Sequence, residues 1–180
     1  MKKGKRMAKG LLVMPALIFL IILGTAAFSS CAGQKTSEKA QEAEANIDDN
    51  TFYESQPVKS GLYDATYFDI TGTNDRKGQF DGRIYFSLAP EMSAIKVFEN
   101  GNRTKIDCTI TLQKPFEKGD SGIYKTVDKK DRPVIVNTSD SANYTLDFQY
   151  SGNDYKITFS PKARYEASAM EILEKITSGK

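Results

Sequence analysis

The sequence predicts a mainly β protein, an antiparallel meander of about eight strands with one C-terminal amphipathic helix. Three observations lead to this prediction. Apolar and polar side chains alternate with period two from residue 61 to residue 159. Short turn signals, rich in Gly, Asn, Asp and Pro, separate the alternating runs. Beyond Ser160 the apolar residues recur at steps of three and four, which is typical of a helix.

Each alternating run predicts a strand that pairs with the next one along the chain, because the connections between them are short. The strongest hairpin signal is Asn100-Gly101, and the run that follows it places Cys108 on its apolar side. Such a meander can form either a closed barrel or a two-sheet sandwich, and the sequence is compatible with both. The predicted strands cover residues 62–70, 80–88, 95–98, 106–112, 123–127, 134–136, 144–150 and 155–159.

The end of the chain predicts one helix over about residues 161–178. Ser160 is a good N-cap, and Pro161 suits the first helical position. Gly179 follows the last turn, where it can end the helix. The predicted apolar stripe, which we expect to face the sheet, consists of Tyr165, Ala169, Ile172 and Ile176.

Meandering strands followed by a C-terminal helix resemble the layout of the lipocalin and calycin barrels. Lipocalins usually carry a Gly-X-Trp motif on the first strand, and here Gly61-Leu62-Tyr63 stands in that place without the tryptophan. The resemblance concerns architecture alone. It implies a barrel interior that can hold a small apolar ligand.

The first thirty residues have the form of an export signal. A basic segment, Lys2 to Lys9, precedes an uncharged apolar run from Leu11 to Phe28. The run ends in Ala26-Ala27-Phe28-Ser29-Ser30-Cys31, which resembles the lipobox of bacterial lipoproteins, with Phe28 where Leu is commonest. The resemblance implies that residues 1–30 are removed and that Cys31 receives a diacylglyceryl group, whose acyl chains, palmitate among them, hold the protein to a membrane. The alternative is an uncleaved membrane anchor.

Residues 31–60 are expected to form a flexible tether behind the lipidated cysteine. Between Ala32 and Asn50 the only large apolar residue is Ile47, so this stretch cannot bury enough surface to fold alone. Residues 51–54 are the part that could dock onto the domain. In an envelope with two membranes, the resemblance to bacterial lipoproteins implies the outer rather than the inner membrane, because residue 32, after the cysteine, is Ala and not Asp.

Charge gives no reason to expect a nucleic-acid partner. The formal net charge of +2 becomes −3 once the first thirty residues are removed, and residues 61–180 carry 17 basic and 17 acidic side chains. The absence of histidine excludes Ser-His-Asp and Cys-His catalysis and the usual zinc ligand sets. The acids Asp64, Asp69, Asp75 and Asp81 lack the spacing of a calcium loop. We therefore expect no enzyme, no cofactor and no metal site.

Cys108 is expected to be a buried small apolar residue, with an intermolecular disulfide as the alternative. Aromatic side chains on the faces opposite the apolar ones are the candidates for ligand or partner contact, because exposed tyrosines bury much area at low entropic cost. They are Tyr63, Tyr67, Tyr85 and Tyr124.

Two functions remain open. One is a membrane-anchored, non-enzymatic binding lipoprotein, with a small apolar ligand in the barrel or a macromolecular partner on the tyrosine-bearing face. The other is a structural or assembly accessory of the cell envelope without a ligand of its own.

Overall fold

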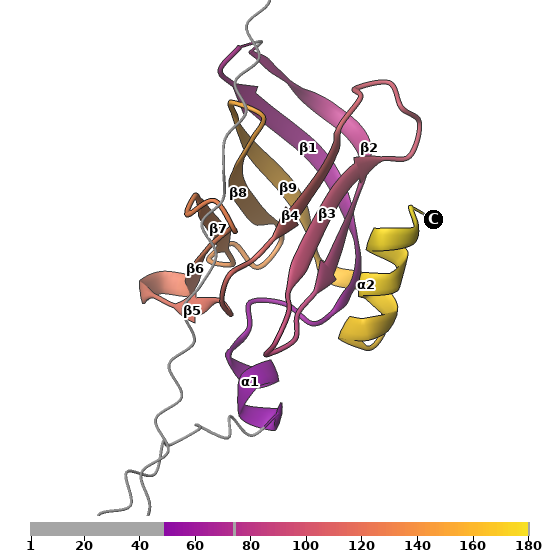
Figure 1. The fold of residues 1–180 in the computed structure, drawn as a ribbon. Coiled ribbons are helices and arrows are strands. Elements are labelled where there is room, and N and C mark those ends of the chain that lie inside the picture. The colour runs from indigo at the N-terminus through magenta and orange to yellow at the C-terminus, as the bar shows by residue number, and fades with distance from the viewer. Residues whose placement is uncertain (1–48, 74, 180) are drawn as a thin grey trace, which may run out of the picture. The chain divides into compact units, whose positions relative to one another are not determined.

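The computed structural model describes residues 49–73 and 75–179, and in this part of the chain nine strands form one antiparallel sheet in the order β4-β3-β2-β1-β9-β8-β7-β6-β5 (Figure 1). The predicted signal peptide, Cys31 and most of the tether lie outside the described residues. The mainly β fold with one C-terminal helix is confirmed.

The bounds of the elements agree closely with the predicted strands, and one short strand, β5, was not predicted. The strands are β1 (Gly61–Thr71), β2 (Arg76–Ser87), β3 (Ala94–Glu99), β4 (Asp107–Thr111), β5 (Glu117–Lys118), β6 (Ile123–Val127), β7 (Pro133–Asn137), β8 (Tyr144–Tyr150) and β9 (Asn153–Glu166). The helices are α1 (Asp49–Ser55), the 3-10 turn η1 (Asp120–Gly122) and α2 (Ala169–Ser178).

The sheet curls into a half-barrel because the first and last strands pair with each other at its centre. β1 lies between β2 and β9, so the meander returns to its starting strand. The two ends of the sheet approach each other at an isolated bridge between Leu112, just after β4, and Asp128, just after β6. Backbone hydrogen bonds from Gln113 to Val127 (3.0 Å) and from Lys129 to Thr111 (3.0 Å) flank the bridge.

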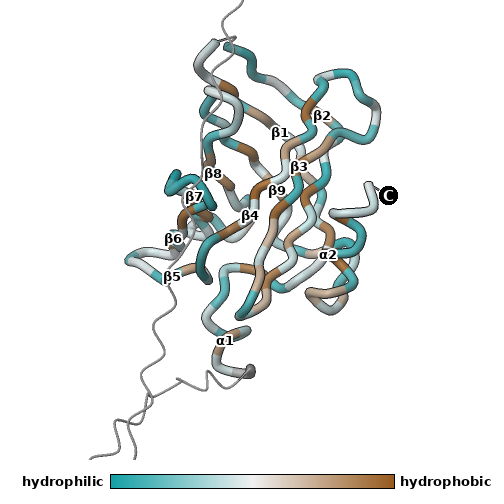
Figure 2. The backbone as a smooth tube through the Cα atoms, in the orientation of Figure 1, coloured by the Kyte–Doolittle hydropathy of each residue, from teal (hydrophilic) through white to brown (hydrophobic). Residues whose placement is uncertain are grey.

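The core lies inside the half-barrel and is packed with aromatic and branched side chains. Hydrophobic residues alternate with polar ones along most strands (Figure 2). Tyr63 contacts Phe86 and Phe159 edge to face, with ring centroids 5.5 and 5.9 Å apart. The largest fully buried side chains are those of Phe86, Phe159, Ile70, Ile84, Leu88, Ile95, Leu146, Ile157, Ile172, Val97, Val134 and Val136. All except Ile172 belong to this inner cluster, so side chains fill the interior.

A β-bulge in the middle of β1 reverses which residues face the core. The pairing of β1 shifts between Ala65 and Tyr67 on both neighbouring strands, β2 and β9. As a result the buried positions are odd-numbered up to Ala65 and even-numbered from Phe68 onward. Tyr63 therefore points into the core, which contradicts its predicted place on the opposite face.

The helix at the end of the chain begins later than predicted. β9 continues through Pro161 to Glu166, and α2 starts at Ala169. Pro161 lies where the β1–β9 register is irregular, and a residue without an N–H is tolerated there. The N-cap is Ser168, whose side chain and that of Glu171 form a capping box. Tyr165, predicted in the apolar stripe, is instead an exposed residue of β9.

α2 packs against the outer side of the sheet, which is the side opposite the core. Ile172 and Ile176 are buried there with Ala94, and the Ser87 hydroxyl donates a hydrogen bond to the carbonyl oxygen of Ala169 (2.7 Å). The predicted apolar stripe is thus confirmed for Ala169, Ile172 and Ile176.

The folded part of the chain begins before residue 61. Phe52 of α1 is 3% exposed, and the side-chain oxygen of Gln56 accepts a hydrogen bond from the backbone N–H of Phe116 (3.2 Å). Residues 49–60 of the predicted tether thus pack onto the domain, in keeping with the expectation that residues 51–54 could dock there. The apolar pair Phe52 and Val58 supplies the buried surface that residues 32–50 lack.

Candidate functional site

Three of the four tyrosines proposed for ligand contact are occupied by contacts within the domain. Tyr63 is 2% exposed, and its hydroxyl donates a hydrogen bond to the carbonyl oxygen of Lys59 (3.0 Å). Burial and the nearby charge of Glu166 raise the pKa of Tyr63 to about 12. Tyr85 packs under α2 and stacks on Phe98, with centroids 5.5 Å apart. Tyr124 packs against the inner core.

Tyr67 is the candidate that the structure leaves available. It follows the bulge in β1, lies on the outer side of the sheet and is 37% exposed. The bulge that turns Tyr63 inward keeps Tyr67 outward. A single tyrosine therefore remains from the predicted set.

Uncharged polar side chains flank Tyr67 on both neighbouring strands. Tyr67 pairs with Gln79 of β2 and with Thr158 of β9. Thr158 pairs with Thr145 of β8, and Thr145 pairs with Asn137 of β7. Cross-strand partners project from the same side of a sheet, so these side chains form a row across five strands that is about 20 Å long. We call this set the neutral row.

Two shallow hollows lie along the neutral row, with Tyr67 in both. One, of about 510 Å³, lies between Tyr67 and the β7–β8 connection, where Asn143 and Ser139 add further amide and hydroxyl groups. The other, of about 580 Å³, lies between Tyr67 and Gln79. Tyr67 therefore lines two open hollows whose walls carry mainly neutral groups, with one aspartate in each, Asp140 in the first and Asp81 in the second.

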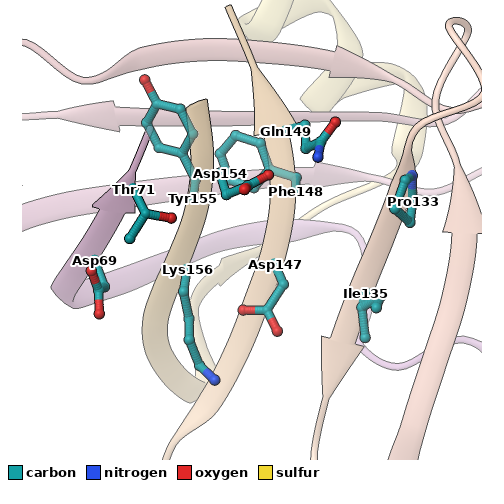
Figure 3. A pocket seen from close by; sticks show the side chains of 10 residues that line it. All are labelled: Asp69, Thr71, Pro133, Ile135, Asp147, Phe148, Gln149, Asp154, Tyr155 and Lys156. Atoms are coloured by element: carbon teal, nitrogen blue, oxygen red, sulfur yellow. The ribbon is translucent and has the colours of Figure 1, made fainter. Parts of the chain in front are cut away.

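A charged row lies beside the neutral row on the outer side of the same strands. Lys156 of β9 pairs with Asp69 of β1 on one side and with Asp147 of β8 on the other, and Ile135 of β7 continues the row. These residues line a pocket of about 340 Å³ (Figure 3). Figure 3 shows the Lys156 side chain between the two aspartates.

Asp147 is the member of the charged row whose ionised form is least well stabilised. Its Oδ1 atom is buried and has no hydrogen-bond partner among the described residues. Burial raises the pKa of Asp147 above its ordinary value, and the charge of Lys156 offsets only part of this effect. Holding this carboxylate ionised therefore costs folding free energy.

We predict that Asp147→Asn stabilises the domain at neutral pH. Because the folded pKa is raised, the folded state binds its proton at a higher pH than the unfolded state. The wild type therefore loses stability as pH rises from the ordinary pKa through the raised one. Urea midpoints of the two proteins should differ at pH 7 and converge toward pH 3. Glu174→Gln, a change on the exposed side of α2, is the control and should leave the pH profile unchanged.

Cys108 is buried at 2% exposure on the inner side of β4, where it packs in the hydrophobic core as expected. Burial raises the pKa of its thiol to about 11, so thiolate is scarce at neutral pH. Within residues 49–73 and 75–179 no group of three or more Cys, Asp or Glu side chains could hold a metal ion. None of the described helices is long and apolar enough to cross a membrane.

The sequence pointed to part of this site. Thr145 and Asp147 stand at outward positions of an alternating strand, so their place on the outer side of the sheet could be predicted. Their alignment with Tyr67 and Asp69 could not, because it depends on the register of the β1–β9 pair, which is irregular at three places.

Comparison of the chain with protein-family models finds no match, and neither do comparisons with curated proteins and with solved structures. The function has to be inferred from the residues themselves.

Proposed function

We propose that this chain is a bacterial lipoprotein whose domain binds a neutral polysaccharide, without catalysis, on the outer side of its sheet. The observation that carries the proposal is the neutral row, an exposed tyrosine ring flanked in register by amide and hydroxyl side chains. The membrane anchor is Cys31, by resemblance to the lipobox.

The chemistry of the neutral row suits a sugar chain better than a charged or an apolar ligand. The apolar face of a sugar ring can stack on Tyr67, and sugar hydroxyls can exchange hydrogen bonds with Gln79, Thr145, Thr158 and Asn137. The five residues of the row carry no ionised group, so covering them with a neutral chain removes no water from a charge within the row. Side chains on strands of one sheet are held in place, which lowers the entropic cost of binding.

A small apolar ligand inside the half-barrel has less support. The interior is filled by side chains such as Phe86, Ile84 and Phe159, each 0% exposed. A ligand there would have to displace packed groups at a cost of several kcal/mol. The surface row is therefore the better supported of the two binding modes.

The proposal is tested by the affinity of the protein for soluble neutral hexasaccharides, such as cellohexaose, laminarihexaose, maltohexaose and mannohexaose. We expect one or more of them to bind and Tyr67→Ala to weaken that binding by on the order of tenfold or more, because exposed aromatic anchors carry much of the binding energy. Isothermal titration calorimetry measures both proteins.

Tyr165→Ala is the matched control for this experiment. Tyr165 is also an exposed tyrosine on a strand, at 44%, but it lies outside the neutral row. It should therefore bind like the wild type. Failure of the wild type to bind any of these sugars, or equal losses in both variants, would contradict the proposal.

The anchor is tested separately through Cys31. Replacing Cys31 with Ala removes the sulfur that would receive the diacylglyceryl group, so we expect full-length precursor and no processed form in the membrane fraction. Labelling with a radioactive fatty acid and a gel shift would detect the difference. A cleaved and labelled species in the variant would rule out Cys31 as the acylation site.

The second candidate function is a structural or assembly accessory of the cell envelope. It is favoured by the packed interior together with exposed apolar side chains such as Met170, which is 70% exposed. The sugar titration separates the two candidates, because an accessory without a ligand predicts no binding.

A further inference from the structure

Exposed large apolar side chains gather at one end of the domain. Within residues 49–73 and 75–179 five such side chains are exposed, and one of them is Tyr67 of the neutral row. The other four are Tyr53 (45% exposed), Met92 (44%), Tyr165 (44%) and Met170 (70%). We call these four the apolar end.

The strand register brings three of the four residues, Met92, Tyr165 and Met170, to one end of the sheet although they are far apart in the sequence. Gly61, which starts β1, pairs with Phe86 near the end of β2 and with Glu166 at the end of β9. The β2–β3 turn that carries Met92, the last residues of β9 with Tyr165, and the start of α2 with Met170 therefore lie at the end of the sheet where β1 begins. α1 lies toward the same end (Figure 1).

Hydrogen bonds hold these segments to each other. The Ser60 hydroxyl donates to the carbonyl oxygen of Leu88 (3.2 Å) and accepts from the N–H of Leu88 (3.0 Å). The N–H of Ala167 donates to the carbonyl oxygen of Ser60 (3.3 Å). A hollow of about 600 Å³ runs between Tyr53 of α1 and Ala169 of α2. The segments that carry the apolar end are thus held in a fixed arrangement by hydrogen bonds.

We propose that the apolar end docks on the surface of the membrane that holds the lipid anchor. The inference rests on the proposed acylation of Cys31. The chain from Cys31 reaches the domain at this end, at Asp49, and 17 residues lie between them. Even fully extended, they span no more than about 60 Å. The bilayer is therefore always within reach of the apolar end, at a high effective concentration.

The side chains of the apolar end suit the interface between lipid and water. Tyrosine is enriched at membrane interfaces because its ring is apolar and its hydroxyl stays hydrated. Met92 and Met170 are flexible apolar side chains that can enter the acyl region.

The charges nearby point to uncharged rather than anionic lipid. The Lys59 ammonium is paired with the Glu166 carboxylate at 3.1 Å, and the Lys175 ammonium lies over the ring of Tyr165, 5.9 Å from its centroid. Glu54, Glu91, Glu171 and Glu174 are exposed acids in the same segments, so acids outnumber the two lysines. Adding anionic lipid should therefore not strengthen the contact.

The absence of tryptophan from the chain allows a direct test. The Tyr53→Trp, Tyr165→Trp and Tyr67→Trp variants each carry a single fluorophore. They are purified as acylated full chains, placed in phosphatidylcholine vesicles and compared with the same proteins in vesicles of phosphatidylcholine brominated on its acyl chains. We expect the first two to emit at shorter wavelength and to lose about half of their emission to the bromines, since docked helices and rings lie about 5–10 Å deep. The Tyr67→Trp variant should keep its emission.

The outcomes separate this inference from the proposed function. If the acylated chains float with the vesicles but all three variants keep their emission, the anchor stands and the docking is overturned. If the three Trp variants float with the vesicles no better than the Cys31→Ala chain, the proposed lipid anchor is contradicted, and the docking that rests on it is contradicted as well. Quenching of Tyr67→Trp alone would place a different face on the membrane and would also contradict the inference.

Discussion

Replacing both Ile172 and Ile176 with Ala is expected to leave the domain largely unfolded, or to lower its melting temperature by many degrees. The two side chains are 0% and 5% exposed, and they form the contact between α2 and the outer side of the sheet with Ala94. Each truncation of a buried Ile costs about 2–5 kcal/mol. A domain of this size has only about 5–15 kcal/mol to lose. Urea and thermal melts measure the effect.

The control for the double variant has to be chosen from the structure. Glu171 lies on the polar side of α2 but belongs to the capping box with Ser168, so its replacement also weakens the helix. Glu174→Ala, at an exposed position of the same helix, should change the free energy of unfolding by less than about 0.5 kcal/mol. Equal urea midpoints for the double variant and Glu174→Ala would mean that α2 is not docked on the sheet.

Asp128→Ala is expected to destabilise the domain by about 3 kcal/mol, because it leaves buried donors without their acceptor. Asp128 is 3% exposed at the bridge that joins the two ends of the sheet. Its carboxylate accepts hydrogen bonds from the N–H groups of Lys130 (2.8 Å) and Arg132 (3.0 Å) and from the Arg132 guanidinium, with Nε at 2.7 Å. Chemical denaturation at pH 7 measures the loss.

Acidification should remove the contribution of the Asp128 carboxylate to the free energy of unfolding of the wild type. Burial raises the pKa of this carboxyl, but the hydrogen bonds from Arg132 and Lys130 outweigh burial and leave the pKa below its ordinary value. The stabilisation is therefore present above the ordinary pKa and is lost as pH falls through the lowered one. Asp131→Asn is the control in the same turn, because asparagine tolerates the left-handed backbone of residue 131 (φ 59°) and this exposed side chain bonds only to Gln113 among the described residues. A loss as large for Asp131→Asn as for Asp128→Ala would contradict this account.

The strands could be predicted because each buries one face, and a buried face imposes period two on the sequence. β5 could not, since its two residues, Glu117 and Lys118, are both exposed and carry no such pattern. The bulge at residue 66 was also missed. A bulge is a feature of the pairing, and nothing in Ala65-Thr66-Tyr67 requires one.

The helix boundary was misplaced because two capping signals compete. Ser160-Pro161 has the composition of a helix start, and Ser168 with Glu171 has it as well. Pairing with β1 extends β9 past the first signal, so the second one begins the helix. Tertiary hydrogen bonds outweigh local preference here.

Only part of the arrangement around Tyr67 could be predicted. The sequence places Tyr67 on an outward strand face, and the structure shows it exposed there. Tyr85 was also placed on the correct side of its strand, yet α2 covers it. Which outward faces a C-terminal helix covers depends on the three-dimensional arrangement, so the sequence alone could not separate these two residues.

The central claim, that the neutral row binds a neutral sugar chain, is tested most directly by nuclear magnetic resonance. The protein, labelled with ¹⁵N, is titrated with a hexasaccharide that binds it in the calorimeter. We predict that the largest chemical-shift changes fall on the backbone amides of Tyr67, Thr145 and Thr158 and on the side-chain amide of Gln79. Changes centred instead on Ile84 and Phe86 of the interior, or on Ile172 of α2, would contradict the claim.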